Sequence, residues 1–107
     1  MSTDSTLVDH ALFAATAVQV VADVMLVAPD TLRPETRLIV DLGAESIDFL
    51  DVVFRLEDVI GRRIPASHWG RFIHDRFGGR DASESITVDT VREFAESEAA
   101  IAAGTAR

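Results

Sequence analysis

The sequence predicts a small all-α protein, a bundle of four helices. Apolar residues recur at spacings of three and four in several segments, as they do along one face of a helix. Prolines and glycines separate these segments, and no stretch alternates strictly between apolar and polar residues as a half-buried strand would. The 107 residues suit one domain over residues 1–107, which we expect to carry short flexible tails at both ends.

The first helix is expected to begin at Thr6, because Thr6 and Asp9 resemble an acidic variant of the capping box. One apolar face follows from there along the segment: Leu7, Ala11, Ala14, Val18, Val21 and Met25. Pro29 and Pro34 cannot continue the helix and lie in a polar cluster. The segment therefore predicts a helix followed by a long loop.

The second helix is expected to start at or just after Ser46 and to run to about Ile60. Gly61 is placed to end it, since glycine readily adopts the left-handed conformation that follows a helix. Arg62 and Arg63 suit the negative end of the helix dipole. This is the best delimited of the four helices.

Two further helices are predicted. Residues 67–77 form a third helix that ends at Gly78 and Gly79. Its apolar face is aromatic: Trp69, Phe72, Ile73 and Phe77. The last helix is expected to begin near Thr90, with Glu93 completing a capping box, and to continue to about Ala102.

The second helix divides into three sectors at about 100° per residue. The sector assigned to the core comprises Phe49, Val52, Val53, Leu56, Val59 and Ile60. The sector assigned to water comprises Asp48, Asp51, Arg55 and Asp58. Between them lies an apolar ridge of Ile47, Leu50 and Phe54. Such a ridge beside acidic residues marks a contact surface, unless the core wraps further around this helix.

Ser46 precedes this helix and has three possible roles. It can be the N-cap, although the reciprocal capping box is absent because Phe49 stands three positions on. A hydrolase nucleophile is disfavoured, since "GAESI" lacks the Gly-x-Ser-x-Gly pattern and neither His68 nor His74 fits a triad order. Covalent modification is the third, because the positive end of a helix favours a phosphate.

Composition excludes several classes of function. The net charge is −8 and every basic residue is arginine, so nucleic acid is an unsuitable partner and basic protein surfaces are suitable ones. The absence of cysteine rules out disulfides and a thiol nucleophile. The most apolar stretch, residues 11–28, is interrupted by Gln19 and Asp23, so no stable membrane insertion is expected. The N-terminus has no signal-peptide pattern, and a cytoplasmic protein is predicted.

The string "DLGAESIDFLDVVFRLEDVIGRRIP", from Asp41 to Pro65, resembles the core of acyl carrier proteins. In that family, Asp-Leu-Gly, an acidic residue, Ser, an aliphatic residue and Asp surround the serine that receives 4′-phosphopantetheine from coenzyme A. The family's Ile-Pro pair appears as Ile64 and Pro65 at the usual distance. The resemblance implies an acyl-carrier-like four-helix bundle in which Ser46 is the attachment site.

The resemblance also implies a partner surface and a function. Acidic and exposed apolar positions that meet the phosphopantetheinyl transferase and the basic docking patches of acyl-processing enzymes match Glu45, Ile47, Asp48, Asp51, Phe54, Glu57 and Asp58. The chain would then be a monomeric carrier, not an enzyme, that holds acyl thioesters for fatty-acid, very-long-chain lipid, lipid A or polyketide-type synthesis. The alternatives are an aminoacyl or peptidyl carrier and an unmodified interaction module.

Two features depart from the family pattern. Arg55 lies within the acidic face, which indicates a different set of partners. An insertion of about residues 66–85 enlarges the region of the third helix. Its apolar face either closes a larger core or reshapes an acyl pocket around Trp69, Phe72, Ile73 and Phe77. No metal site is predicted, and we expect surface or capping roles for His68 and His74.

Overall fold

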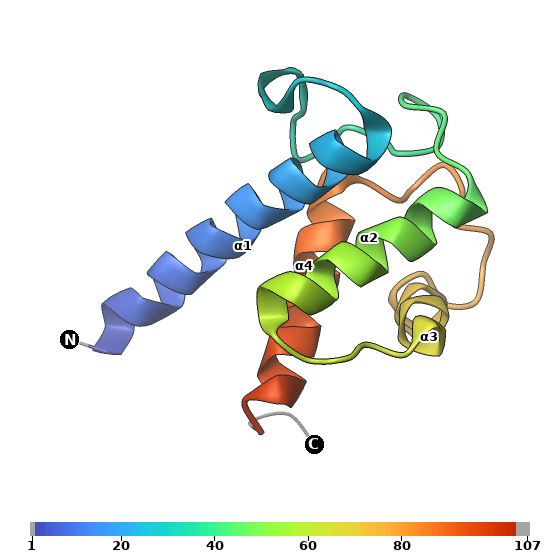
Figure 1. The fold of residues 1–107 in the computed structure, drawn as a ribbon. Coiled ribbons are helices and arrows are strands. Elements are labelled where there is room, and N and C mark those ends of the chain that lie inside the picture. Colours follow the sequence, from blue (N-terminus) through green and yellow to red (C-terminus); the bar gives the residue numbers. More distant parts are fainter. Residues whose placement is uncertain (1, 105–107) are drawn as a thin grey trace.

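The computed structural model describes residues 2–104, and of residues 2–9 it describes the backbone alone (Figure 1). The helices are α1 (Ser2–Met25), α2 (Ser46–Ile60), α3 (Ala66–Arg76) and α4 (Val88–Ala102), with a short 3-10 turn at Pro29–Thr31. The described part of the chain contains no β-strand. The all-α, four-helix prediction is confirmed, including the long loop between α1 and α2.

α1 begins at Ser2, so the predicted start at Thr6 is wrong. No proline or glycine stands before Leu7 to prevent the helix from extending toward the N-terminus. The proposed pairing of Thr6 with Asp9 lies outside the described side chains. α1 ends where predicted, just before Pro29, and Leu26 leaves it in the left-handed conformation with φ of 59°.

The loop between α1 and α2 is tied to the segment that leads into α4. The Leu38 N–H donates to the Ile86 carbonyl at 2.9 Å, and the Val88 N–H donates to the Thr36 carbonyl at 3.0 Å. Leu38 is also buried in the core. These contacts fix the approach of the chain to α2 and so position the residues around Ser46.

α2 buries most of the predicted core sector: Phe49, Val52, Val53 and Leu56. Val59 does not follow, because 53% of it is exposed. It lines a hollow whose other wall includes Ala99 and Ala102 of α4 and Ala103, which follows that helix. These alanine side chains are too short to cover Val59, so its assignment to the core is wrong. Gly61 ends α2 as predicted, with φ of 83° and its N–H bonded to the Glu57 carbonyl.

The N-cap of α4 lies three residues before the predicted one, Thr90. This N-cap is Thr87, whose hydroxyl accepts from the Thr90 N–H at 3.2 Å, while the Thr90 hydroxyl accepts from the Thr87 N–H at 3.0 Å. A threonine therefore takes the place that glutamate or glutamine holds in the usual capping box. Glu93, which was predicted to cap α4, instead accepts a hydrogen bond from Arg76 of α3 at 2.8 Å.

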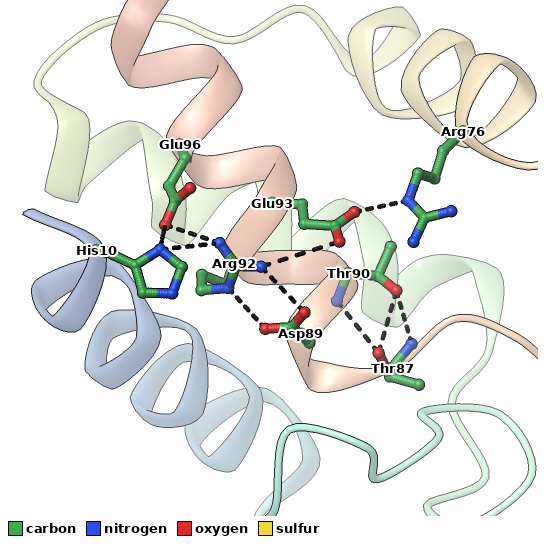
Figure 2. A network of polar contacts seen from close by, with 8 residues as sticks. All are labelled: His10, Arg76, Thr87, Asp89, Thr90, Arg92, Glu93 and Glu96. Atoms are coloured by element: carbon green, nitrogen blue, oxygen red, sulfur yellow. Dashed lines mark hydrogen bonds and ion pairs between the residues drawn. The ribbon is translucent and has the colours of Figure 1, made fainter. Parts of the chain in front are cut away.

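A network of charged side chains joins α4 to α1 (Figure 2). Arg92 Nε and Nη2 donate to the two carboxylate oxygens of Asp89 at 2.6 and 3.0 Å. Arg92 Nη1 lies 2.9 Å from Glu96 Oε2, which is also 3.1 Å from His10 Nδ1 of α1. Only 13% of the Arg92 side chain is exposed. These carboxylates therefore offset the cost of burying its positive charge.

The hydrogen bonds from Arg92 hold the pKa of Asp89 below its usual value. A carboxyl group whose pKa is lower in the folded protein contributes stability above its unfolded pKa, and this contribution disappears as pH falls through the folded pKa. Asp89→Asn should therefore lower the free energy of unfolding at neutral pH and reduce its loss on acidification. Urea unfolding between pH 7 and the acid limb measures both effects, and Glu84→Gln, an exposed acidic position, should change neither.

Candidate functional site

Ser46 is exposed and is the first residue of α2, but it is not the N-cap. The N-cap is Glu45, whose N–H donates to Asp48 Oδ2 at 2.8 Å. As expected, Ser46 and Phe49 form no capping box; the capping pair of α2 lies one residue earlier and joins Glu45 to Asp48. The Ser46 hydroxyl has no hydrogen-bond partner among the described residues, which leaves it free to react.

The loop before Ser46 is held by Asp41 and Gly43. Asp41 Oδ2 accepts from the backbone N–H of Arg37 at 2.8 Å, and this bond lowers the pKa of Asp41. Gly43 has φ of 74°, a conformation that strains other residues. The Ala44 N–H then donates to the Leu38 carbonyl at 2.9 Å, and Ala44 is buried. The Asp-Leu-Gly string thus forms a turn that presents Ser46 at the surface.

A hollow of about 740 Å³ opens beside Ser46. Its lining comprises Ile39, Ala44, Glu45, Ser46, Phe49, Leu50, Val53 and Trp69. Glu45 and Ser46 are exposed and adjacent in sequence at the start of α2, and the rest of the lining is apolar. An apolar chain attached at Ser46 would therefore meet mainly apolar side chains in this hollow.

The aromatic residues of α3 divide between the hollow and the core. Trp69 lines the hollow and stacks on Phe49, with ring centroids 5.4 Å apart and planes at 18°. Phe72 packs edge-on against Phe94 at 5.4 Å. Ile73 and Phe77 are half-buried against the core and, like Phe72, do not line this hollow. Of the four residues predicted for an acyl pocket, Trp69 alone lies at the hollow.

The predicted partner surface on α2 is partly exposed. Among its apolar members, Ile47 is 69% exposed and Phe54 is 57% exposed. Leu50, the third residue of the ridge, is 42% exposed and lines the hollow. The ridge therefore faces outward, and the alternative in which the core wraps around this part of α2 is excluded.

The acidic members differ from one another in their contacts. Glu45 and Asp58 are exposed, whereas Asp48 and Asp51 are half-buried. Arg55 Nε lies 3.3 Å from Asp51 Oδ1, so the departure at Arg55 offsets part of the acidic charge.

Glu57 has a structural contact. Its Oε2 accepts from the Ile64 N–H at 2.8 Å and so fastens the Ile64-Pro65 turn to α2. Its carboxylate is therefore less available to a partner than the exposed carboxylates of this surface.

The sequence did not reveal the contact that His68 makes with α4. We expected a surface or capping role, but His68 Nδ1 lies 2.9 Å from Glu98 Oε2 of α4. Glu98 is 4% exposed. Thirty positions separate the two residues, so no local pattern could have paired them. Glu98 lies on α4, and its burial results from the packing of α3 against that helix. The local sequence does not reveal this packing.

Comparisons with known proteins identify the family of this chain. The family described as "Phosphopantetheine attachment site" matches residues 15–68, half of the chain, including Ser46. The chain belongs to the acyl carrier protein family. Its cofactor is therefore 4′-phosphopantetheine. Ser46 and the adjacent hollow fit that group, because the hydroxyl is free and the amide end of α2 favours a phosphate.

Individual acyl carrier proteins are similar over about half of this chain. The acyl carrier protein AcpXL of Mesorhizobium japonicum is 37% identical over 57 residues, which are 53% of this chain and 61% of that protein. AcpXL of Brucella melitensis is 36% identical over 56 residues, 52% of this chain and 60% of its own length. The acyl carrier protein of Campylobacter hominis is 39% identical over 54 residues, 50% and 68% of the two chains.

The match to these relatives is partial. The matched part of the chain spans about six-tenths of the length of the AcpXL relatives. Within residues 2–104, no helix combines the length and the apolar character needed to cross a bilayer.

Proposed function

We propose that this chain carries acyl groups as thioesters on a 4′-phosphopantetheine arm attached to Ser46 and delivers them to acyl-processing enzymes. The observation that supports this most directly is the exposed Ser46 hydroxyl at the mouth of a hollow with apolar walls. Acyl carrier proteins are carriers and not catalysts, so the chain needs no catalytic residue for this role.

Each part of the site would have a separate task. The arm supplies a thiol on which the acyl group is held. Ser46 provides the oxygen that joins the arm to the protein, and the free amides of the first turn of α2 stabilise the phosphodiester charge. The hollow between α2 and Trp69 shelters the acyl chain from water. Such a carrier would work in the cytoplasm, where coenzyme A and the acyl-processing enzymes are present.

Partner enzymes would dock on the surface of α2. The proposed surface consists of Glu45, Ile47, Asp48, Asp51, Phe54, Glu57 and Asp58. Exposed carboxylates steer a basic partner during encounter, and a small apolar footprint allows rapid release. Glu45, Asp58, Ile47 and Phe54 are exposed and suit this role best. The transferase that modifies Ser46 would use the same surface.

Incubation of the purified chain with coenzyme A and a broad-specificity phosphopantetheinyl transferase tests the proposal. The expected result is one added phosphopantetheine group per chain, measured by intact mass. A folded chain that several such transferases leave unmodified would contradict the proposal and favour an unmodified interaction module. Loading of the modified chain by acyl-activating rather than aminoacyl-activating enzymes would then exclude an aminoacyl or peptidyl carrier.

Ile47→Ser should slow modification while leaving the fold intact. Ile47 is 69% exposed, so we expect the free energy of unfolding to change by no more than about 0.5 kcal/mol. Loss of one apolar side chain from a docking contact should lower kcat/KM of the transferase about tenfold. Ile101→Ser, an exposed isoleucine on α4, is the matched control and should leave kcat/KM unchanged. Equal rates for the two variants would remove Ile47 from the docking surface.

We further propose that the insertion at residues 66–85 adapts the hollow to a long or modified acyl chain, for fatty-acid, very-long-chain lipid or polyketide-type synthesis. Trp69 supports this because it supplies a wall of the hollow from within the insertion. Thioester hydrolysis should be compared across acyl lengths between the wild type and a chain shortened within residues 66–85, or Trp69→Leu if the shortened chain does not fold. Equal protection of long chains in both proteins would contradict this role.

A further inference from the structure

α3 is attached to the rest of the bundle by few contacts. None of its residues is buried, although Trp69, Phe72 and Ile73 pack against the core with one side. Its described ion pairs with another helix both reach α4: His68 contacts Glu98 at 2.9 Å and Arg76 contacts Glu93 at 2.8 Å. In Figure 1, α3 is viewed almost along its axis, whereas α1, α2 and α4 run across the view. A helix attached in this way can move without unfolding the core.

Glu98 makes the first of these contacts unusual. Its side chain is 5% exposed, and a carboxylate in that position needs a hydrogen-bond donor. Among the described side chains, His68 is the one that meets this need. Arg71 and Asp75 line the same small hollow between α3 and α4, of about 180 Å³. Arg71, the cation of the two, forms no described ion pair with Glu98. His68 therefore contributes to holding α3 in its present position.

The same contact lies next to Trp69 in the chain and helps to hold it in place. Trp69 follows His68 in the chain, and its ring forms a wall of the hollow beside Ser46. The ring stacks on Phe49 and meets Phe94 edge-on at 5.1 Å. Because adjacent residues of one helical turn move together, a displacement that separates His68 from Glu98 also moves Trp69 away from α2.

We propose that His68 and Glu98 are positioning residues that hold α3 closed over the hollow beside Ser46, and that an acyl chain enters when this pair separates. The proposal rests on the carrier function proposed above, but the closure of α3 can be measured without a cofactor. The ligand class is an acyl chain long enough to pass Trp69.

Hydrogen exchange of the unmodified protein tests the closure. Loss of the hydrogen bond to a charged group in His68→Ala should make the amides of α3 exchange about tenfold faster, with little change in α1 and in the buried part of α2. His68→Asn should restore most of the protection, because an asparagine amide can donate from nearly the same place as imidazole Nδ1. Ser67→Ala, an exposed change on the same helix outside this hollow, should have no effect.

Three results would overturn the proposal: unchanged α3 exchange in His68→Ala, an equal loss of protection in every helix, or no recovery in His68→Asn. If His68→Ala does not fold, Glu98→Gln replaces it, since a neutral acceptor weakens the bond while keeping the shape of the side chain. In that variant α3 exchange should still rise above that of the wild type.

A second measurement connects the pair to cargo. With the arm and an acyl series attached, His68→Ala should hydrolyse long-chain thioesters faster than the wild type, while His68→Asn should resemble the wild type. Identical hydrolysis in all three proteins would overturn the role in acyl entry. Failure of the wild type to accept the arm would instead contradict the proposed function, and the exchange results of the unmodified protein would still stand.

Discussion

Ser46→Ala is expected to abolish the uptake of phosphopantetheine while leaving the fold unchanged. The Ser46 hydroxyl is exposed and has no hydrogen-bond partner among the described residues, since Glu45 and Asp48 form the capping pair of α2. The change should therefore alter the free energy of unfolding by no more than about 0.5 kcal/mol. Without the hydroxyl oxygen no phosphodiester can form. Intact mass after incubation with transferase and coenzyme A measures the effect.

Ser67→Ala is the matched control for this experiment. Ser67 is also exposed and also lies in the first turn of a helix, α3, but it does not follow an Asp-Leu-Gly string and does not line the 740 Å³ hollow. It should be modified at the wild-type rate. If Ser46→Ala still gains the group, a different serine is the attachment site. If Ser46→Ala unfolds, the conclusion that the N-terminal cap of α2 does not depend on Ser46 is wrong.

The sequence predicted those parts of the fold that depend on local spacing. The repeat of Phe49, Val52, Val53 and Leu56 identifies the buried face of α2, and each of the four is buried. Gly61 is the end of α2 because a positive φ favours glycine at that position. Both features are set within one helix, so a single sequence is enough to find them.

Capping was harder to predict than helix content. Ser46 and Thr90 are favoured cap types, yet the observed N-caps are Glu45 and Thr87. Which residue becomes the cap depends on where the chain leaves its extended conformation, and here the preceding loops set that point. The backbone bond from Leu38 to Ile86 and the burial of Ala44 are long-range contacts that local patterns do not reveal.

The candidate site likewise combines features that the local sequence predicts with features that depend on long-range contacts. The motif around Ser46 predicts the attachment residue from the local sequence alone. The hollow beside it also needs Ile39 from the loop and Trp69 from α3, which the motif does not contain. Likewise, the pairing of His68 with Glu98 arises because α3 packs across α4. Contacts between elements far apart in sequence therefore determine the shape of the site, whereas its reactive residue is predicted from the local motif.

Phe94→Ala is expected to have the largest effect on stability. Phe94 is completely buried on α4, and Trp69 and Phe72 of α3 pack their rings against it at 5.1 and 5.4 Å. Truncation of a buried phenylalanine costs about 3–5 kcal/mol. A small domain is stable by only about 5–15 kcal/mol, so the variant should be close to unfolding at 37 °C. Urea unfolding followed by circular dichroism measures the loss.

Phe54→Ala separates burial from the loss of an aromatic ring. Phe54 lies on α2 and is 57% exposed, so its truncation should change the free energy of unfolding far less than that of Phe94. Because Phe94 also supports Trp69, any folded Phe94→Ala protein should show altered Trp69 fluorescence, whereas Phe54→Ala should not. Similar losses in the two variants would mean that the contacts of Phe94 with α3 contribute little, and that the bundle is stabilised chiefly by the packing of α1 against α2 and α4.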